Sequence, residues 1–229
     1  MDLIRIAIIT PVYGAYEQAY INSLILCLSR PLVDISFSLV SPCGSSNITA
    51  ARNVCIQDVF LQEEAFKKRF DYLLFIDSDI IFTYEDIQKL LGHKKDIIAG
   101  LYFAKGAPFF PVAGYYDINK IENGFPKITK EQVTSKKLLE VDWAGCGFLL
   151  FKREIIDKLE YPWFDMRVID LPKPEKRGGG FVIKKELLSE DISFCTKVKE
   201  AGYKIYLDTN VLLKHLGKSN FTIEHFLAL

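Results

Sequence analysis

Long apolar runs and a charge imbalance are both missing from this sequence of 229 residues. No stretch approaches the ~20 consecutive apolar residues that a membrane-spanning helix needs, so we expect no transmembrane segment. No basic leader precedes the first apolar run, which is short and typical of a strand. Lysine plus arginine and aspartate plus glutamate number 29 each, which gives no general electrostatic reason to bind nucleic acid or an anionic membrane.

Spacings typical of disulfide or zinc frameworks are missing as well. The five cysteines are scattered, odd in number and never spaced as C-x-x-C; they are Cys27, Cys43, Cys55, Cys146 and Cys195. This pattern disfavours a disulfide framework and a structural zinc site, and it favours a reducing compartment. We therefore expect a cytoplasmic protein, with peripheral association at a membrane left open.

Internal repeats, low-complexity segments and sharp shifts of composition are also missing from the sequence. Hydrophobic residues make up 49% and aromatic residues 13% of the chain, which is typical of a globular protein. A chain of this length has room for a substantial core. We therefore expect one domain over residues 1–229.

Strand-like and helical patterns alternate along the first half of the chain. Nearly continuous apolar runs are typical of strands in a buried parallel sheet. A capping pattern at Thr83 predicts the start of a short helix. The expected strands are 3–10, 34–40, 71–76 and 96–103, and the expected helices are 15–28, 47–70 and a short one ending at 91. This order predicts an α/β fold with a parallel sheet covered by helices on both faces.

The second half is expected to contain shorter strands and fewer helices. Asn123-Gly124 is typical of a hairpin turn. Residues 171–180 are rich in proline and glycine, which leaves a substrate-gated lid and a simple surface loop both open. The expected strands are 112–116, 121–128, 138–142, 148–152 and 203–207, and the expected helices are 153–159 and 189–202.

Two carboxylates follow the expected strand 71–76, in the tripeptide Asp77-Ser78-Asp79. Side chains two residues apart on a strand point the same way, so Asp77 and Asp79 can reach one object if the extended geometry persists. Two carboxylates held so close need a proton or a cation between them. Mg²⁺ and Mn²⁺ prefer oxygen ligands and usually hold a substrate phosphate as well. The alternative is a solvated turn, because turns favour the same residue types.

Five segments in order resemble the GT-A fold glycosyltransferases, above all the family 2 type and its short single-domain relatives. These segments are 10–13, 47–53, 75–79, 144–153 and 189–217. The resemblance implies a Rossmann-like, mostly parallel central sheet flanked by helices, with a smaller mixed sheet on the acceptor side. It also implies a nucleotide-binding half over 1–103 and an acceptor-binding half over 104–229.

The resemblance assigns metal ligands to the acidic tripeptide and to a distant histidine. It makes Asp79 the direct ligand, Asp77 a ligand of the ribose or the metal, and His215 a further metal ligand. An imidazole ligand favours Mn²⁺, with Mg²⁺ as the alternative. A lone histidine is also common as a structural or exposed residue. Lys218 is expected either to contact the diphosphate or to be a solvated lysine. The other two histidines are expected at the surface: His93 and His225.

An acidic pair opens the expected helix 189–202. Negative side chains at a helix start are favoured by the helix dipole alone, which is one interpretation of Glu190 and Asp191. The resemblance implies the other, in which one acid is the general base that accepts the proton of a sugar hydroxyl. It favours Asp191, with Glu190 as the alternative, and it implies inversion at the anomeric carbon, although retaining enzymes share this fold.

The resemblance also implies residues that bind the donor nucleotide. Thr10, Pro11 and Tyr13 match the segment that holds the nucleobase, and Tyr13 would either stack on the base or pack against the next helix. Arg52 matches a residue near the nucleotide; the alternative is a helix-surface arginine paired with an acid. Asn53 would support the loop.

A segment on the acceptor side carries three further candidates. Trp143 offers a flat face for a sugar ring, and Gly145 lets the backbone approach the donor sugar closely. Asp142 would either hydrogen-bond the donor sugar or simply end a strand.

The resemblance therefore implies a hexosyltransferase that takes a sugar from a UDP- or GDP-sugar and transfers it to a hydroxyl of a glycan, lipid-linked or protein acceptor. One rival is a nucleotidyltransferase that makes sugar nucleotides, which usually carries a glycine-rich basic loop after the first strand. Here that position contains no lysine or arginine over residues 10–14. The other rival is a catalytically silent module with the same fold.

Overall fold

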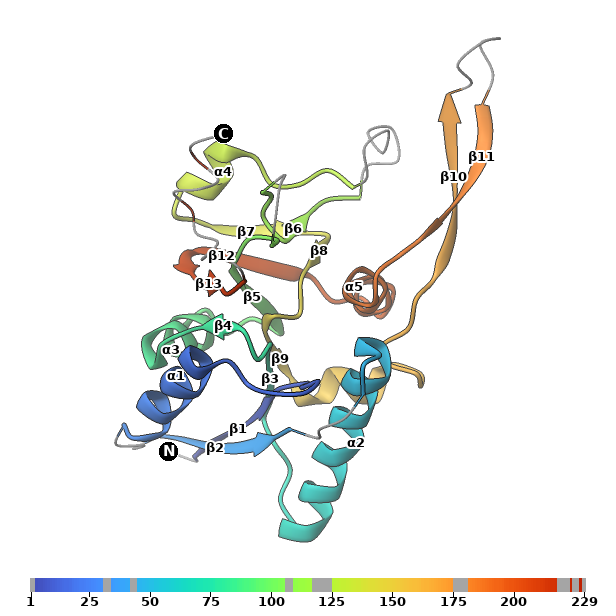
Figure 1. Cartoon of the computed structure of the whole chain (residues 1–229). Coiled ribbons are helices and arrows are strands. Elements are labelled where there is room, and N and C mark those ends of the chain that lie inside the picture. Colours follow the sequence, from blue (N-terminus) through green and yellow to red (C-terminus); the bar gives the residue numbers. More distant parts are fainter. Residues whose placement is uncertain are drawn as a thin grey trace.

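A seven-stranded sheet forms the centre of the protein (Figure 1). The computed structural model describes residues 3–30, 34–41, 45–105, 109–116, 125–174, 181–217, 223 and 227. The spatial order of the sheet is β2-β1-β3-β9-β5-β12-β7. Its strands are β1 (Ile4–Ile9), β2 (Ile35–Val40), β3 (Tyr72–Ile76), β5 (Ile97–Leu101), β7 (Leu138–Val141), β9 (Phe148–Lys152) and β12 (Ile205–Leu212).

Most strands of this sheet are parallel, as the alternation of strands and helices predicts. The exceptions are β9, which is antiparallel to both β3 and β5, and the edge strand β7, which is antiparallel to β12. The first four residues of β9 are almost completely buried, from Phe148 to Phe151. A fully buried apolar run has the same pattern in either orientation, so the sequence predicts this strand and its bounds but not its antiparallel insertion.

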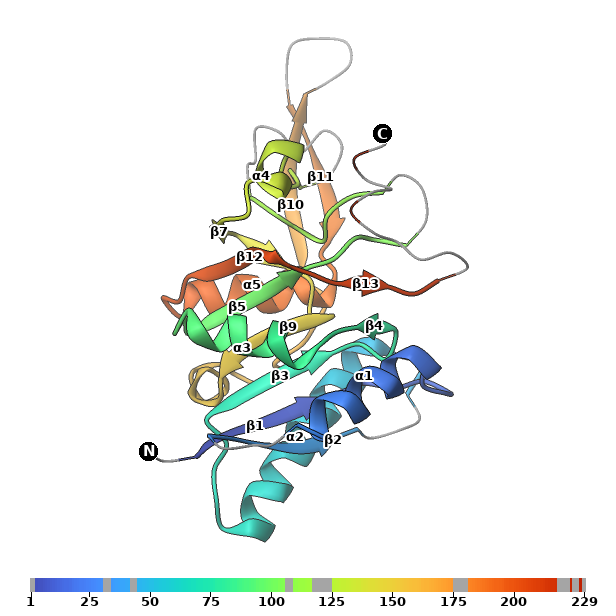
Figure 2. The same cartoon turned by 90° about the vertical axis from the view of Figure 1, so that its left-hand side faces the viewer.

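Helices cover both faces of the sheet (Figure 2). The helices are α1 (Gln18–Leu28), α2 (Ile48–Phe66), α3 (Tyr84–Gly92), α4 (Lys130–Thr134) and α5 (Glu190–Glu200), with a 3-10 helix at Arg153–Lys158. Alternate residues of β1 face opposite layers. Ile6 and Ile8 belong to the core cluster with α1 and α3, whereas Ala7 and Ile9 belong to the cluster with α2 and α5.

Side-chain caps start the helices where the sequence predicts them. Thr83 and Asp86 form a complete capping box at α3. Asn47 accepts a backbone hydrogen bond at the start of α2, and Ser189 does so at α5. Helix α2 ends at Phe66, earlier than expected, because Lys67 adopts a left-handed conformation with φ of 52°.

Residues 171–174 of the segment expected as a lid or loop belong to a two-stranded antiparallel ribbon. Strand β10 (Val168–Pro174) pairs with β11 (Phe181–Leu187), and the ribbon extends away from the body of the protein (Figures 1 and 2). The prolines at 172 and 174 suggested a loop, but proline is tolerated on an edge strand, and β10 pairs on one side only. Residues 175–180 lie outside the described part of the chain.

Two pairs of short strands bring distant segments together, and only one of the four strands, β6, lies within an expected strand. Strand β12 extends to Leu212, past its expected end at 207, with a bulge after Asp208. The chain then forms β13 (Lys214–His215), which pairs with β4 (Ile80–Ile81) directly after the acidic tripeptide. Another two-residue pair joins β6 (Ala113–Gly114) to β8 (Trp143–Ala144). The expected hairpin turn at 123–124 lies outside the described residues.

His93 is half-buried rather than a free surface residue. It caps the C-terminus of α3, and its Nε2 lies 2.8 Å from Oδ2 of the buried Asp208. The sequence shows no link between these positions because they meet only through the packing of α3 on β12. Cys43 and His225 lie outside the described residues, and the other four cysteines are buried and free. No helix in the described ranges is both long and apolar enough to cross a membrane.

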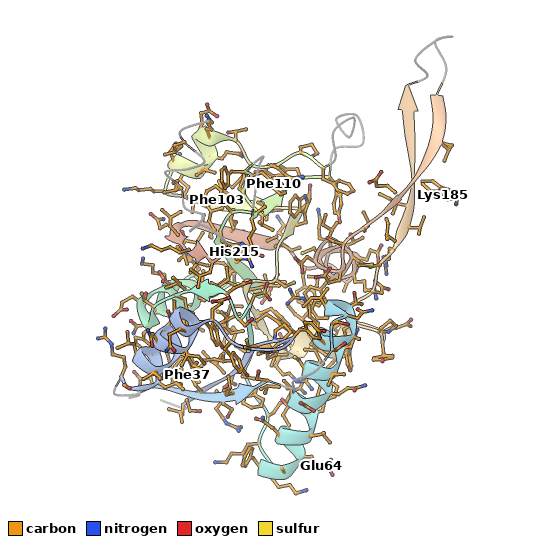
Figure 3. All side chains as sticks on the ribbon, in the orientation of Figure 1. Phe37, Glu64, Phe103, Phe110, Lys185 and His215 are labelled. Atoms are coloured by element: carbon orange, nitrogen blue, oxygen red, sulfur yellow. The ribbon has the colours of Figure 1, made fainter. Side chains whose placement is uncertain are left out.

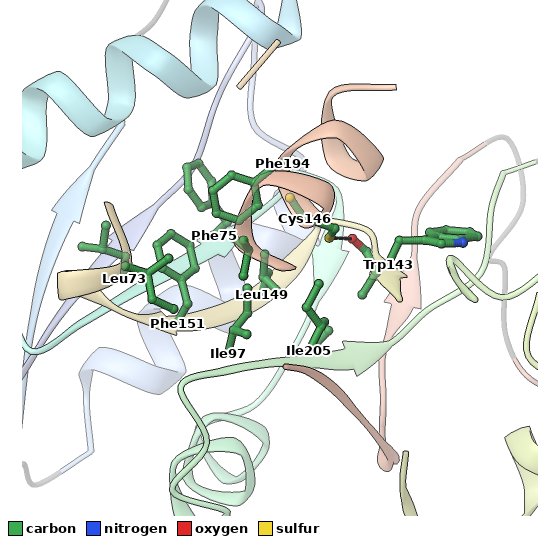
Figure 4. Close-up of a cluster of buried hydrophobic side chains, with 14 of the residues drawn as sticks. Leu73, Phe75, Ile97, Trp143, Cys146, Leu149, Phe151, Phe194 and Ile205 are labelled. Atoms are coloured by element: carbon green, nitrogen blue, oxygen red, sulfur yellow. Dashed lines mark hydrogen bonds between the residues drawn. The ribbon is translucent and has the colours of Figure 1, made fainter. Parts of the chain in front are cut away.

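An aromatic cluster fixes α5 against the sheet (Figure 4). Phe194 of α5 stacks on Phe164 with ring centroids 4.5 Å apart, and Phe75 of β3 lies edge-on to Phe164 at 5.3 Å. Phe151 of β9 completes the group at 5.5 Å from Phe194. Such buried rings contribute through both area and geometry. Because α5 is anchored in this way, its first residues lie close to the end of β3.

Replacement of Gly145 by alanine is expected to destabilise the fold. A Cβ atom at Gly145 would lie 2.0 Å from the hydroxyl of Tyr102 and 2.6 Å from a methyl group of Val112. Overpacking of this kind costs roughly 1–3 kcal/mol. Gly92→Ala is the matched control, because a Cβ there meets nothing within 4 Å among the described residues. Urea unfolding of both variants measures the difference, and equal stability of the two would contradict this packing.

Candidate active site at the carboxyl ends of the strands

A cavity of about 510 Å³ opens where β1, β3 and β5 end. Its walls come from the segments that follow these strands, from the first turns of α2 and α5, and from β13. Ligand sites in open α/β sheets lie at this edge, because the loops after parallel strands meet there. Seven candidates named from the sequence line the cavity. One is Pro11, and the other six are charged or titratable: Arg52, Asp77, Asp79, Glu190, Asp191 and His215.

Asp77 and Asp79 line the same cavity but engage different partners. Strand β3 ends at Ile76, and a turn follows in which the Ile80 amide donates to the Asp77 carbonyl at 3.0 Å. The extended geometry therefore does not persist through the tripeptide. Asp77 Oδ1 lies 3.2 Å from Arg52 Nη2, whereas Asp79 faces His215.

His215 is oriented so that its Nε2 atom faces Asp79. The pairing of β13 with β4 sets its position, and Nδ1 donates a hydrogen bond to the Phe103 carbonyl at 2.8 Å (Figure 3). Nε2 then lies 3.3 Å from Asp79 Oδ1. That oxygen is buried and has no hydrogen-bond partner in the described part of the chain. Because a neutral imidazole with Nδ1 protonated offers only a lone pair at Nε2, this arrangement calls for a proton or a cation between the two groups.

Lys105 supplies the other partner of Asp79. Its ammonium group contacts Asp79 Oδ2, and its side chain remains 40% exposed. Burial of Asp79 opposes ionisation, but the contacts with His215 and Lys105 outweigh this, so the pKa of Asp79 is lowered. No local pattern indicates this contact, because Lys105 follows β5 and lies 26 positions from Asp79 in the chain.

Asp79 and His215 would supply two ligands to one divalent cation, and water or a substrate phosphate would supply the others. The described residues contain no group of three or more His, Cys, Asp or Glu arranged to hold a metal ion. The carboxylate of Asp77 pairs with Arg52, and its expected role near the ribose or the metal stays a prediction. Mg²⁺ is often bound through one or two protein ligands plus substrate phosphates and water, so a pair is a sufficient protein contribution.

Arg52 is buried at the centre of the acidic residues. Its side chain is 2% exposed and lies within 3.6 Å of three carboxylates, those of Asp77, Glu190 and Asp191. Burial alone would lower the pKa of the guanidinium, but Asp77 and Asp191 offset this, and the pKa stays well above its usual value. Arg52 is thus paired with acids, as in the alternative interpretation, but from a buried position and not from the helix surface. Its expected place near the nucleotide stays a prediction.

Asp191 is the carboxyl group with the most perturbed ionisation in the cavity. Burial raises the pKa of Asp191 to about 6, with Arg52 acting against this shift and the neighbouring Glu190 and Asp77 adding to it. Its Oδ1 has no hydrogen-bond partner among the described residues and lies 3.5 Å from Arg52 Nη2. A carboxyl group with a pKa near neutrality in a cavity is typical of a general acid or base.

Tyr102 lies beneath the acidic residues and was not identified from the sequence. It is 4% exposed, its hydroxyl accepts from the Gly147 amide at 3.0 Å, and its ring packs edge-on against His215. Burial raises its pKa, and Asp191 and Asp77 add to this effect, so the hydroxyl stays protonated. Gly145 and Gly147 make room for Tyr102. This corrects the expectation for Gly145, since the close approach is to a tyrosine of this chain.

The three residues expected near the nucleobase differ in their burial and in whether they line the cavity. Pro11 lines the cavity. Thr10 is fully buried, and its hydroxyl is bonded to the Tyr20 hydroxyl, so its side chain is part of the core and cannot contact a base. Tyr13 is 71% exposed and does not line the cavity. The residue after a buried strand can point into the core or out of it, and the sequence pattern does not distinguish the two.

The acceptor-side candidates lie outside the cavity. Asp142 accepts from the Tyr116 amide at 2.7 Å and contacts Lys199, so it ends a strand and joins it to α5. Trp143 is 3% exposed in the core, which leaves no open ring face for a sugar. Its indole lies instead beneath the Lys127 ammonium, 5.1 Å from the ring centroid. Lys218 lies outside the described residues.

Comparisons with known proteins bear on the fold. No protein-family model matches the chain, and no curated protein matches it in sequence. The crystal structure of A197 from STIV aligns over 96% of this chain and 94% of its own, with a TM-score of 0.54 and 16% sequence identity. This similarity shows that the chain shares a GT-A-like glycosyltransferase fold.

Two crystal structures of S. aureus TarS, the second covering 1–349, also align with 95% of this chain. Their TM-scores are 0.45 and 0.44, and their sequence identities are 12% and 13%. This chain spans 36% and 59% of those two chains.

Removal of the buried guanidinium is expected to destabilise the protein, and more so at high pH. Arg52→Met leaves three carboxylates without their shared cation, and breaking a buried ion pair in this way costs about 3–5 kcal/mol. Burial already raises the pKa of Asp191 and Arg52 opposes this shift, so without Arg52 the folded-state pKa of Asp191 would lie further above its unfolded value. The contribution of such a group to stability is present at low pH and is lost as the pH rises through the folded-state pKa. The deficit should therefore be larger at pH 8 than at pH 5.

Urea unfolding at the two pH values measures this deficit. Arg69→Met is the control, because the Arg69–Asp157 pair is exposed and such surface pairs contribute less than about 1 kcal/mol. A deficit for Arg52→Met that is as small as the control, or independent of pH, would show that the carboxylates do not depend on Arg52.

Proposed function

We propose that this protein is a glycosyltransferase that transfers a hexose from a UDP- or GDP-sugar to an acceptor hydroxyl, with Mn²⁺ or Mg²⁺ as cofactor. The observation that carries the proposal is the Asp79–His215 pair, which lies in one cavity with the buried carboxyl group of Asp191. The GT-A-like fold supports the same reaction class. The acceptor would be a glycan, a lipid-linked molecule or a protein.

The charge of the cavity supports a requirement for a divalent cation. Among the described residues that line it, four are carboxylates and the permanent cations are Arg52 and Lys105. Two negative charges are therefore not balanced within these walls. A nucleoside diphosphate is itself an anion, and like charges at short range repel strongly in a partly desolvated site. Such a donor can bind here only together with additional positive charge.

Asp79 and His215 are the residues that would hold this cation. Asp79 Oδ1 is buried and unpaired among the described residues, and the Phe103 carbonyl orients His215 Nε2 toward it. When bound, the ion would supply the charge that stabilises the departing nucleoside diphosphate. Imidazole together with carboxylate favours Mn²⁺ over Mg²⁺.

Asp191 is the proposed general base. In the transfer step, the acceptor oxygen forms a bond to the anomeric carbon while the bond from that carbon to the diphosphate oxygen breaks, and the acceptor proton passes to Asp191. A single displacement of this kind inverts the anomeric configuration. Glu190 is the alternative base, but its side chain is 11% exposed, against 19% for Asp191, which leaves Glu190 less accessible to an acceptor.

The donor nucleoside is proposed to lie between Pro11 and the start of α2. Pro11, which follows β1, and Ile48 both line the cavity. In the spatial order of the sheet, β1 lies on one side of β3, and β12, which leads to His215, lies on the other. Asp77 would then be near the ribose. Its carboxylate already has Arg52 as a partner, so a ribose hydroxyl would share it by donating a second hydrogen bond.

Loss of the proposed metal ligand is expected to abolish transfer without unfolding the protein. Asp79→Asn keeps the size of the side chain but removes its charge, so donor binding supported by Mn²⁺ should be lost. EDTA should likewise silence the unsubstituted protein, and Mn²⁺ or Mg²⁺ should restore it. Thermal shift with UDP- and GDP-sugars reports binding, because ligands that bind the native state raise its apparent stability.

Product analysis of the same reactions distinguishes the rival activity. Release of a nucleoside diphosphate supports glycosyl transfer, whereas release of pyrophosphate would indicate a nucleotidyltransferase. Activity of Asp79→Asn equal to that of the unsubstituted protein would remove the metal proposal.

The rate of transfer is expected to fall below about pH 6. A general base must be deprotonated, and burial raises the pKa of Asp191 to about 6, so kcat/KM should rise between pH 5 and pH 7. An acidic limb close to pH 4 would exclude Asp191 as the base. Asp191→Asn should lower kcat by about 10²–10⁴-fold while the Kd of the donor changes little, since it removes only the proton acceptor. Equal loss of donor binding would make the residue structural.

A further inference from the structure

Lys105 has a position that the proposed reaction does not yet explain. Its ammonium group contacts Asp79 Oδ2, directly beside the pair proposed to hold the divalent cation. The backbone that leads to Lys105 is paired with the segment that starts at Phe110. The Ala104 amide donates to the Phe110 carbonyl at 2.9 Å, and Phe103 forms a bridge with Pro111. This pairing holds the residue before Lys105 at the wall of the cavity.

Each oxygen of Asp79 faces one neighbouring group in this state. Oδ1 faces His215 Nε2 at 3.3 Å, and Oδ2 is occupied by Lys105. A divalent cation bound to Asp79 would sit next to the ammonium group, and like charges at this separation repel strongly. The lysine and the metal cannot both keep their full contact with this carboxylate. One of them must leave, and the lysine then needs another anion.

The donor supplies such an anion within reach. A diphosphate would bind beside the cation at Asp79, and a lysine ammonium is a compact donor on a flexible four-carbon stem. Arg52 cannot take this role, because it is 2% exposed and is held by three carboxylates and by the rings of Phe75 and Phe164. Lys105 is 40% exposed at the cavity, so it is free to turn.

We propose that Lys105 exchanges partners during the reaction cycle: it neutralises Asp79 in the empty protein and binds a diphosphate oxygen of the donor once a divalent cation occupies Asp79. This inference rests on the proposed metal site at Asp79 and His215. Its consequence is thermodynamic coupling. The nucleotide removes the lysine that competes with the metal, and the metal frees the lysine for the nucleotide, so each raises the affinity for the other.

Direct binding of Mn²⁺ tests this coupling without any transfer reaction. Free Mn²⁺ is measured by electron paramagnetic resonance during titration of the protein alone, with UDP and with GDP. In the unsubstituted protein, UDP or GDP should lower the Kd of Mn²⁺ by roughly 5–150-fold, the usual range of coupling between two sites. In Lys105→Met, Mn²⁺ alone should bind more tightly than to the unsubstituted protein, and the effect of the nucleotide should shrink toward one-fold.

Two further variants isolate the role of the charge at this position. Lys105→Arg keeps a cation and should retain weak binding of Mn²⁺ alone together with most of the coupling. Lys204→Met is the matched control, since Lys204 is an exposed lysine that pairs with Glu140 outside the cavity, and it should behave as the unsubstituted protein does. Lys105→Gln replaces Lys105→Met if thermal unfolding shows that the methionine variant does not fold.

The outcomes separate this inference from the proposed function. If Asp79→Asn abolishes Mn²⁺ binding while Lys105→Met leaves the affinity for Mn²⁺ alone unchanged or lower, the metal site stands and the exchange is wrong. If Asp79→Asn and the unsubstituted protein bind Mn²⁺ equally, the metal site is wrong and the exchange falls with it. Tighter binding of Mn²⁺ alone in Lys105→Met, with reduced coupling to the nucleotide, supports both.

Discussion

A buried guanidinium shared by three carboxylates is the interaction on which the rest of this structure depends. Arg52 loses almost all contact with water, and such a charge is tolerated only when opposite charges surround it. Asp77 comes from the end of β3, and Glu190 and Asp191 come from the start of α5. The three ion pairs that neutralise Arg52 therefore also hold the proposed donor side of the cavity close to its proposed acceptor side. The same four charged groups therefore contribute both to the stability of the fold and to the geometry of the site.

Lys105 is a second positive charge in the wall of the cavity, and it differs from Arg52 in its exposure to solvent. Arg52 is 2% exposed and is surrounded by three carboxylates, whereas the side chain of Lys105 is 40% exposed and contacts Asp79. Even with both cations the cavity carries an excess of carboxylates. An acidic site of this kind can accept a nucleoside diphosphate only with added positive charge, so the proposed metal requirement and the proposed movement of Lys105 follow from the same imbalance.

Features with local signals could be predicted from the sequence. Buried strands appear as apolar runs, and the capping box at Thr83 marks a helix start through residues only three apart. Pairings between distant segments have no such signal. Neither the antiparallel insertion of β9 nor the contact of β4 with β13 could be predicted, because strand register depends on the partner. For the same reason Trp143 was expected to face a sugar, although the β6–β8 pair and the core cover it.

The sequence by itself determined the α/β alternation and the clustering of acidic residues after strands, since both follow from local periodicity and from the common edge at which parallel strands end. The grouping of His215 with the acidic tripeptide was available only as a resemblance. The tertiary structure alone decided that Lys105 and Tyr102 belong to the cavity and that the side chain of Thr10 does not. The physical reason is that these contacts join segments far apart in the chain, and only packing and strand register bring such segments together.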